Sequence, residues 1–400
     1  MTGSVLFYVQ HLLGIGHLQR ALYLVDAIAD EDIAVTLVMG GEPPRWPISV
    51  RAARIVQLAP IKARDASFKE LIGPGGRPID QNLQRARRAA LLAAFDAVRP
   101  DAVVIEAFPF GRRAFRFELE PLLEAARARR PRPRMFCSVR DIVVLPDDAT
   151  RRREIIDRVQ ADFDFVLVHG DPGFIPLDES FPAAPKIADR LIYTGYISAP
   201  DHTDEKDAAG GANEILVSVG GGAVGGPLLT MALEARRRGC RADLTWRLLA
   251  GPNLPAQTFE MLAESLPEGV VLERYRREFP SMLRRCSVSV SQGGYNTILD
   301  ILGARAPAVV VPFASERETE QQLRAERLAA RGVIELLDET NLTPGRLTRA
   351  IERAIERGPG TISVQVDGAR RTASLIAGMI RDPGAIPNAA EILYRGSAAL

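Results

Sequence analysis

Residues 291–300, SQGGYNTILD, combine a glycine turn with a carboxylate about two helical turns further on. The β-branched run at 288–290 predicts a strand before them, and the residues after Gly294 predict a helix. Gly293 and Gly294 permit a tight turn, after which free N–H groups at the helix start can bind an anion. The Asp300 carboxylate is suited to accept hydrogen bonds from both hydroxyls of a ribose. The stretch therefore predicts a nucleotide-diphosphate site, and an ordinary turn with a solvated Asp300 is the alternative.

A second glycine loop, with Gly14 and Gly16, follows the apolar run at 5–9 and precedes a helical pattern. His17 is expected in the first turn of that helix, where the helix dipole disfavours a charged imidazole. A neutral imidazole is a competent general base. The alternative is a histidine that caps the helix or packs locally.

Glu106 is the last residue of a predicted strand at 102–106, and Pro109 interrupts regular structure shortly after it. A carboxylate at the carboxyl end of a parallel strand points to the edge where open α/β sheets bind ligands. Glu106 can therefore orient His17 or bind a sugar hydroxyl. An ion pair with Arg112 or Arg113 is the alternative, and the sequence does not separate these possibilities.

A third loop, GGGAVGG at 220–226, follows the predicted strand at 214–219. Gly220, Gly221 and Gly222 would leave backbone N–H groups bare for a pyrophosphate. The loop lacks the Lys-Ser/Thr pair of an ATP-binding P-loop. It also lacks the G-x-G-x-x-G pattern with an acid about 20 residues on that is typical of dehydrogenases.

Strands and helices alternate through the whole chain, which predicts an α/β protein with parallel sheets. The polar, Gly- and Ala-rich segment 198–213 has no apolar period and is expected to be a linker. We therefore expect two Rossmann-like doubly wound domains, residues 1–197 and 214–360. Residues 361–400 are expected to form a C-terminal helix or tail that packs back on the N-terminal domain. Residues 60–78 are expected to form a long loop with some helix.

Composition is that of a globular protein, with 46% hydrophobic and 25% charged residues. With a formal net charge of +1, the protein has no overall positive electrostatic field that would attract nucleic acid. The three cysteines, Cys137, Cys240 and Cys286, are widely spaced, which fits a reducing cytoplasm rather than a disulfide framework. The first residues do not resemble a signal peptide, and no apolar run is long enough to span a membrane. A cytoplasmic location is expected, with a peripheral position at the inner membrane face left open.

These motifs together resemble the GT-B glycosyltransferases, and most specifically the group around the bacterial peptidoglycan GlcNAc-transferase, over residues 215–337. The resemblance implies two Rossmann-like domains facing a central cleft and a UDP-linked sugar donor. The loop at Gly14 and Gly16 would face the acceptor. The resemblance also assigns donor contacts. These are Gly220, Gly221, Gly222, Arg276, Gly293, Gly294, Asn296, Thr297 and Asp300 for the nucleotide, and Gln321 and Gln322 for the sugar.

Three departures from the family pattern stand out. The family usually has Glu at the position of Asp300, Tyr295 and Asn296 are bulkier than its usual residues, and the segment before Gln321 is longer. The loop at 14–20 also resembles that of nucleotide-sugar hydrolases on the same scaffold.

The expected reaction is transfer of a sugar from a nucleotide-diphosphate sugar to a hydroxyl acceptor. Helix-start N–H groups would stabilise the leaving diphosphate, and His17 or Glu106 would remove the acceptor proton. No Asp-x-Asp pair is placed to hold a metal, so metal independence is predicted and no cofactor is expected. A nucleotide-sugar hydrolase and a non-catalytic nucleotide-sugar binding protein are the alternatives. The acceptor is open among lipid-linked, sugar and small-molecule classes. Phe108 and Phe110 with nearby arginines are either a lipid-facing patch or core.

Overall fold

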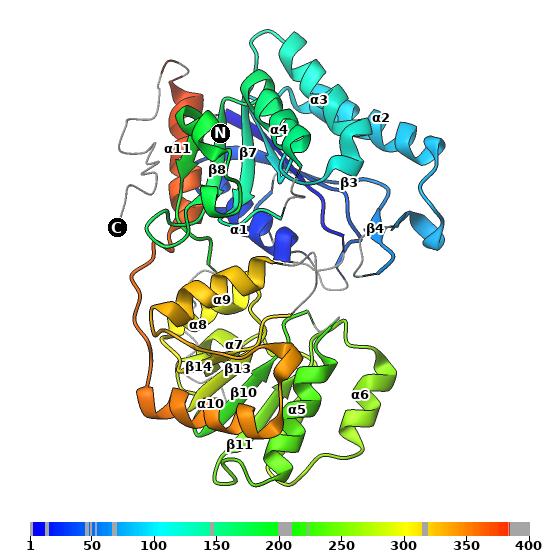
Figure 1. Cartoon of the computed structure of the whole chain (residues 1–400). Helices are drawn as coiled ribbons and strands as arrows, with labels where there is room; N and C mark the ends of the chain where they lie inside the picture. The colour runs from blue at the N-terminus through cyan, green and yellow to red at the C-terminus, as the bar shows by residue number, and fades with distance from the viewer. Residues whose placement is uncertain are drawn as a thin grey trace. The chain divides into compact units, whose positions relative to one another are not determined.

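The computed structural model describes residues 3–12, 16–44, 48, 50–52, 54–65, 70–144, 148–198, 210–221, 224–313, 319–382 and 384. The chain divides into two compact units, Met1–Ser198 with Val364–Leu400 (unit 1) and Ala199–Ser363 (unit 2). Each unit contains its own parallel sheet (Figure 1). Residues 199–209 of the predicted linker lie outside the described residues, so the linker stays a prediction.

Unit 1 is built on a seven-stranded parallel sheet in the order β3-β2-β1-β6-β7-β8-β9. Its strands are β1 (Gly3–Val9), β2 (Ile33–Met39), β3 (Arg54–Gln57), β6 (Ala102–Glu106), β7 (Arg134–Arg140), β8 (Phe165–His169) and β9 (Leu191–Tyr193). From β1 the chain first proceeds to β2 and β3 on one side, and then crosses to β6 and beyond on the other. The order therefore reverses between β1 and β6, and ligands of open α/β sheets bind outside the carboxyl ends of strands at such a point.

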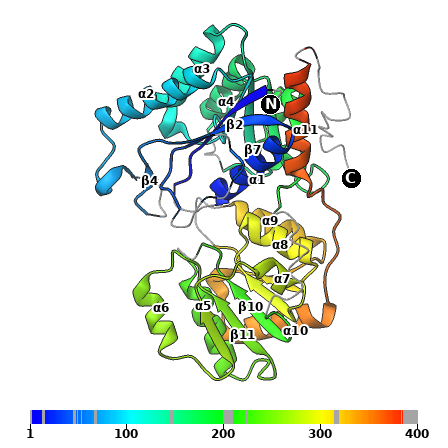
Figure 2. The same ribbon diagram turned by 180° about the vertical axis from the view of Figure 1, so that it is seen from behind.

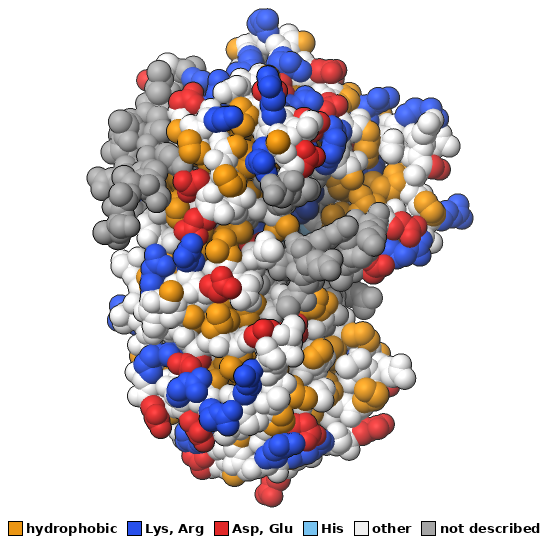
Figure 3. Space-filling view, in the orientation of Figure 1, with side chains coloured by type: hydrophobic (Ala, Val, Ile, Leu, Met, Phe, Trp, Pro, Cys, Tyr) orange, Lys and Arg blue, Asp and Glu red, His pale blue; other side chains and the backbone are white. Residues whose placement is uncertain are grey.

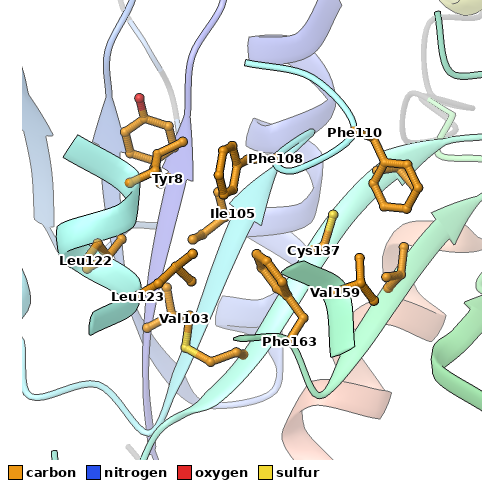
Figure 4. Close-up of a cluster of buried hydrophobic side chains, with 14 of the residues drawn as sticks. Tyr8, Val103, Ile105, Phe108, Phe110, Leu122, Leu123, Cys137, Val159 and Phe163 are labelled. Carbon is orange, nitrogen blue, oxygen red and sulfur yellow. The ribbon is translucent and has the colours of Figure 1, made fainter. Parts of the chain in front are cut away.

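Helices cover both faces of this sheet. They are α1 (Gly16–Asp30), α2 (Gln81–Val98), α3 (Arg116–Ala128), α4 (Ala149–Asp162) and α11 (Gly368–Arg381), with short 3-10 turns η2 (Arg113–Phe115), η3 (Leu177–Glu179) and η4 (Ala184–Arg190). Side chains of β1 alternate between two cores, because Leu6 and Tyr8 pack under α2, α3 and α4 while Val5, Phe7 and Val9 pack under α1 and α11. Figure 4 shows the first of these cores. Burial on both faces explains why β1 reads as an unbroken apolar run.

The helix α11 returns from the end of unit 2 and lies beside α1 (Figure 2). Ala373, Ile376 and Ala377 bury its apolar stripe in the core that α1 shares, and Ser374 Oγ donates to Glu31 at 2.7 Å. The helix starts at Gly368, within the residues 361–400 that were expected to form a C-terminal helix or tail. Backbone atoms just before it pair with the chain after β9, where Tyr196 N donates to Gln365 O at 2.6 Å.

The segment at 60–78, expected to be a long loop with some helix, contains regular structure in its described residues, while residues 66–69 lie outside them. It contains a short antiparallel pair, β4 (Lys62–Ala63) and β5 (Leu71–Ile72), and a 3-10 turn, η1 (Pro74–Gly76). Ile61 is buried in the core under α2 and Leu71 packs against that core, which anchors this segment.

Unit 2 is built on a six-stranded parallel sheet in the order β12-β11-β10-β13-β14-β15. Its elements are β10 (Glu214–Ser218), α5 (Gly226–Arg237), β11 (Thr245–Leu249), α6 (Ala256–Ala263), β12 (Val270–Glu273), α7 (Phe279–Leu283), β13 (Val288–Ser291), α8 (Tyr295–Ala304), β14 (Ala308–Val310), α9 (Glu320–Ala330), β15 (Glu335–Leu336), η5 (Glu339–Asn341) and α10 (Pro344–Arg357). Here the strand order reverses between β10 and β13, which is where the second ligand-binding edge is expected.

The surface of both units mixes charges of both signs. Figure 3 shows acidic and basic side chains interspersed over the displayed face of each unit, in keeping with the net charge of +1. Phe108 and Phe110 are not part of this surface. They are 1% and 3% exposed, and the Phe110 ring packs edge-on against Phe181 with ring centroids 5.3 Å apart. The alternative in which they form a lipid-facing patch is therefore wrong, because the core under α3 and α4 absorbs both rings.

Candidate functional site

The reversal point of unit 1 brings His17 and Glu106 together. His17 lies in the first turn of α1, which follows β1, and Glu106 is the last residue of the neighbouring strand β6. The Nδ1 atom of His17 lies 2.5 Å from Oε1 of Glu106, and Arg20 donates from Nη2 to the same oxygen. Because Glu106 is 1% exposed and His17 is 22% exposed, the carboxylate is enclosed while the imidazole remains accessible.

These contacts fix the tautomer of His17. Glu106 Oε1 accepts a hydrogen bond from Nδ1 of His17, so Nδ1 carries the proton and Nε2 keeps its lone pair. Nη2 of Arg140, at the carboxyl end of β7, donates to Nε2 at 3.2 Å. The pKa of His17 is lowered to about 3, mainly by burial. The positive charges of Arg140 and Arg112 lower it further, and together these effects outweigh the raising effect of Glu106. His17 is therefore neutral at physiological pH and presents a basic nitrogen.

Glu106 is an ionised carboxylate. Burial alone would raise its pKa, but contacts with His17, Arg20 and Arg112 outweigh burial and lower the pKa below that of an ordinary glutamate. Of the ion-pair alternatives, Arg112 Nη2 lies 4.0 Å from Glu106 Oε2, whereas Arg113 reaches Glu154 instead. Oε2 has no hydrogen-bond partner among the residues that the structure describes.

Two glycines were expected to accompany His17. Gly16 is the first residue of α1, and Gly14 lies outside the described residues. His169, at the end of β8, is fully buried and lies 2.8 Å from both Ser138 Oγ and Thr194 Oγ1, so its ring atoms are used within the fold.

The reversal point of unit 2 brings together two of the predicted glycine loops. Ser218, at the end of β10, pairs in register with Ser291, at the end of β13. Gly220 and Gly221 therefore leave the sheet at the same edge as Gly293 and Gly294, while Gly222 lies outside the described residues.

A left-handed backbone at Gly220 and a close approach at Gly293 explain why glycine suits these two positions. Gly220 has a left-handed backbone with φ of 57°, and a Cβ atom there would be 4.0 Å from Thr297 Oγ1 of α8. A Cβ atom on Gly293 would lie 3.2 Å from the backbone oxygen of Gln321. Gly294 is the N-cap residue of α8, and no side chain accepts a hydrogen bond from the first N–H groups of this helix.

Asn296, Thr297 and Asp300 are half-buried on α8, where spacings of three and four residues place them on one face. Burial raises the pKa of Asp300 to about 7, with no compensating cation identified among the described residues. A carboxylate held in this state is poised for a ligand that supplies hydrogen-bond donors.

The other predicted residues of unit 2, Gln321, Gln322 and Arg276, differ in how near they lie to the two glycine loops. Gln321 Oε1 accepts from Phe313 N at 3.2 Å beside Gly293, whereas Gln322 Nε2 donates to Glu326 at 2.7 Å along the outside of α9. Arg276 follows β12, which β11 and β10 separate from β13, and its Nε donates to Glu273 at 2.6 Å.

Sequence reasoning missed polar atoms on and after β13. Ser291 and Gln292 are 0% and 6% exposed, and Ser291 Oγ and Gln292 Nε2 have no hydrogen-bond partner among the described residues. Unpaired buried polar groups are costly, and a ligand or water that supplies the missing hydrogen bond is one explanation for them. Gln292 stands within the SQGGYNTILD stretch, directly before its glycines, and that position was the available signal. Arg140 was missed at the His17 site, and its place at the end of β7 was the signal there, whereas Arg112 had been considered only as an ion-pair partner of Glu106.

In the part of the chain that the structure describes, no three His, Cys, Asp or Glu side chains group as metal ligands would. A cavity of about 290 Å³ lies between β9 and α11, lined by Tyr193, Arg370, Arg371 and Ser374 among others. It includes none of the residues that the sequence singled out. No helix among the described residues is long and apolar enough to cross a membrane.

Residues 216–362 match the model of the glycosyltransferase family 28 C-terminal domain. An uncharacterized glycosyltransferase of Methanopyrus kandleri is 26% identical over 49% of this chain and 56% of its own length. The UDP-N-acetylglucosamine–N-acetylmuramyl-(pentapeptide) pyrophosphoryl-undecaprenol N-acetylglucosamine transferase of Phenylobacterium zucineum is 24% identical over 53% of this chain and 56% of its own length. The chain thus spans about half the length of the curated relatives it matches.

Among solved structures, the calicheamicin glycosyltransferase CalG4 aligns with a TM-score of 0.59 and 18% identity, covering 96% of this chain and 95% of that one. The GT-B fold and the resemblance to GT-B glycosyltransferases are therefore confirmed.

Proposed function

We propose that this GT-B protein, with its family 28 C-terminal domain, is a glycosyltransferase that moves a sugar from a nucleotide-diphosphate sugar to a hydroxyl acceptor. The observation that carries the proposal is the pairing of a neutral, accessible His17 with a buried, ionised Glu106. An imidazole oriented by a carboxylate is the arrangement of a general base. A protein that only binds a nucleotide sugar has no use for it.

In the proposed reaction, His17 Nε2 takes the proton of the acceptor hydroxyl as its oxygen attacks the anomeric carbon of the donor. The bond from that carbon to the diphosphate oxygen breaks, and its electron pair leaves with the nucleoside diphosphate. Glu106 accepts from Nδ1 throughout and stabilises the imidazolium that forms. Unit 2 would hold the donor.

The donor site is proposed on the loops that follow β10 and β13. N–H groups at the start of α8 would take the diphosphate, and Asp300 would accept from the ribose hydroxyls. Gln321 is the better placed of the two glutamines for the sugar, because it adjoins Gly293 while Gln322 is paired elsewhere. We propose stabilisation of the leaving group by these N–H groups without a metal. A uridine donor is proposed because the Phenylobacterium relative is named for UDP-N-acetylglucosamine.

The test is to incubate the full chain with UDP-, GDP-, TDP- and CDP-sugars and to measure nucleoside diphosphate release, with and without a chelator. A panel of lipid-linked, sugar and small-molecule hydroxyl acceptors accompanies each donor. Release that requires an acceptor and is lost in His17→Ala supports the proposal. Release without any acceptor would instead indicate a hydrolase, and binding of a nucleotide sugar without turnover would indicate a binding protein.

A further inference from the structure

The cavity between β9 and α11 has no part in the proposed reaction. β9 is the last strand of the unit 1 sheet, so one of its edges has no neighbouring strand among the described residues. The cavity lies beside this strand and has a volume of about 290 Å³. It is lined by residues 192–194 and, on α11, by Arg370, Arg371, Ser374 and Leu375. Pockets for small ligands begin at about 300 Å³, so this volume suits a small molecule.

The wall on the β9 side combines apolar and polar groups. Ile192 is 2% exposed and belongs to the core that α11 shares, and Leu375 packs against the same core from the helix. Thr194 N donates to Val168 O of β8 at 3.0 Å. Because successive N–H groups of a strand point to opposite sides, the N–H of Tyr193 points away from β8, toward the open edge of the sheet. The cavity therefore has an apolar floor beside a backbone donor.

Arg371 supplies a positive charge that no carboxylate in the described part of the chain pairs with. Its Nη1 donates to Oε1 of Gln365, which is a neutral amide oxygen. The neighbouring Arg370 differs, because its Nη2 lies 3.2 Å from Oδ2 of Asp367. A planar guanidinium binds a carboxylate or phosphate with two parallel hydrogen bonds, so an oxyanion is the ligand group that Arg371 fits best.

A second carboxylate, Glu31, contacts the lining through Ser374, whose Oγ donates to it at 2.7 Å. Oε2 of Glu31 lies 3.3 Å from Nη2 of Arg381, further along α11. No ion pair joins Arg371 to Glu31 or to Asp367, although all three side chains are described by the structure. The charge of Arg371 therefore remains available to a ligand.

The cavity adjoins the place where the chain passes between the two units. Tyr196 N donates to Gln365 O at 2.6 Å, and Gly368 N donates to Tyr196 O at 3.0 Å. Both crossings of the chain between the units lie just outside this backbone pairing. Gln365 is also the partner of Arg371, so the cavity and the backbone pairing share a residue.

We propose that the cavity between β9 and α11 binds a small organic anion, whose carboxylate or phosphate pairs with Arg371 and whose apolar part lies against Ile192 and Leu375. The inference goes beyond sugar transfer and does not depend on it, because none of the residues that line the cavity takes part in the proposed reaction. A bound anion would link β9 to α11 next to both crossings of the chain. Its presence should therefore reduce opening of the backbone pairing there.

Calorimetry of the full chain with small probe molecules tests the site. Phosphate and acetate supply the oxyanion alone, phenyl phosphate and benzoate add an apolar ring, and benzyl alcohol supplies the ring without the charge. We expect saturable binding of phenyl phosphate or benzoate, roughly tenfold tighter than that of phosphate or acetate, because the ring buries apolar surface. Benzyl alcohol should not bind. Tighter binding of phenyl phosphate points to a phosphate ester as the ligand class, and tighter binding of benzoate to a carboxylate.

Matched variants assign the binding to this cavity. Arg371→Gln should weaken binding of the ring-bearing anion roughly tenfold or more, because it removes a charge-assisted pair of hydrogen bonds. Arg371→Lys keeps the charge but not the paired geometry, so its affinity should fall between those of wild type and Arg371→Gln. Arg381→Gln removes the same charge from a 49% exposed position on the same helix, outside the lining, and should leave the affinity unchanged.

Hydrogen exchange adds a readout that does not depend on affinity alone. With the ring-bearing anion at saturation, peptides covering residues 191–198 and 364–371 should exchange roughly threefold more slowly than in the free protein. The inference is overturned if no ring-bearing anion binds, if benzyl alcohol binds as tightly as the anions, or if exchange in these two peptides does not change. Full binding in Arg371→Gln, or an equal loss in Arg381→Gln, would place the anion elsewhere on the protein and also overturn it.

Discussion

The Nδ1 atom of His17 lies 2.5 Å from Oε1 of Glu106, although 89 residues separate them in the chain. They meet because β1 and β6 are neighbours at the point where the strand order of unit 1 reverses. Arg20, one turn along α1 from His17, donates to the same carboxylate oxygen. The geometry therefore combines a fixed tautomer with an enclosed negative charge.

Glu106→Gln should lower the rate of sugar transfer roughly 100-fold or more, because the amide no longer stabilises the imidazolium that forms on His17. Donor binding should be unchanged, since the proposed donor site belongs to unit 2. Steady-state rates and calorimetry with the active donor provide the measurement. Glu154→Gln, which removes an exposed partner of Arg116, serves as the control and should retain full activity. A full rate in Glu106→Gln would remove the carboxylate from the mechanism.

The pH dependence of His17 follows from its lowered pKa. A pKa of about 3 means that the imidazole stays neutral across pH 5 to 8, so His17 should contribute no loss of rate in that range. Its ring NMR signals should show no titration between these values. A titration of His17 near pH 6.5 would contradict the assignment.

The same pKa affects folding stability. An unfolded His17 protonates near pH 6.5 while the folded one does not, so its contribution is present above pH 6.5 and is lost as pH falls. Denaturant unfolding between pH 7 and pH 4 should therefore show a smaller loss of stability for His17→Gln than for wild type. Equal losses would mean that the folded imidazole also protonates.

The sequence was sufficient to predict two α/β domains with glycine loops at their strand ends, but not the strand orders or the charged side chains around His17. Alternation of apolar runs with helical patterns specifies parallel strands, and this places His17 near Glu106 and Gly220 near Gly293. Arg140 has a long side chain whose direction depends on tertiary packing, so spacing alone does not place it at Nε2 of His17. Phe108 and Phe110 illustrate the same limit, because neighbouring arginines resemble a lipid-facing patch until the core is known.

Asp300 should make unit 2 less stable as pH rises. The unfolded carboxyl ionises near pH 3.8, but the folded one stays protonated up to about pH 7. The loss of unfolding free energy caused by Asp300 therefore grows between pH 3.8 and about pH 7 and is constant above that, reaching at most about 4 kcal/mol. Asp300→Asn should be more stable than wild type at pH 8 and equal to it near pH 3.5, as measured by denaturant unfolding.

The same variant tests the role proposed for Asp300 in nucleotide binding. Asp300→Asn should weaken binding of the ribonucleoside diphosphate more than that of its 2′-deoxy analogue, because the deoxy compound already lacks one hydroxyl contact. Equal weakening of both nucleotides would place Asp300 away from the ribose.

Unit 1 contains a buried ion pair that Gln10 links to Arg112, because Arg112 Nε donates to Gln10 O. Arg87 and Glu118 are both 0% exposed, with Arg87 Nη2 2.6 Å from Glu118 Oε1, and Arg87 also donates to Gln10 Oε1 at 2.9 Å. Arg87→Met should destabilise unit 1 by about 3–5 kcal/mol, since it leaves Glu118 as a buried, unpaired charge. Arg64→Met, which removes the exposed ion pair between Arg64 and Glu70, should lower the free energy of unfolding by less than about 1 kcal/mol. Thermal unfolding compares the two variants, and similar losses would show that burial does not control the cost.

Gln292 provides the sharpest test of the donor site. Its buried Nε2 has no partner among the described residues, so Gln292→Leu should raise the free energy of unfolding by about 1–3 kcal/mol. If the amide donates to the diphosphate, the same change should weaken nucleoside diphosphate binding roughly tenfold while leaving the nucleoside unaffected.

Ser289→Ala is the matched control, because Ser289 Oγ is likewise buried and without a partner in the described part of the chain, but lies earlier in β13. It should raise stability without changing nucleotide binding. Calorimetry with the nucleoside, its diphosphate and the diphosphate sugar separates the possibilities. A loss confined to the diphosphate sugar would move the contact of Gln292 from the phosphates to the sugar. A variant that gains stability yet binds all three ligands as wild type does would remove Gln292 from the site, because its unpaired amide would then serve no ligand.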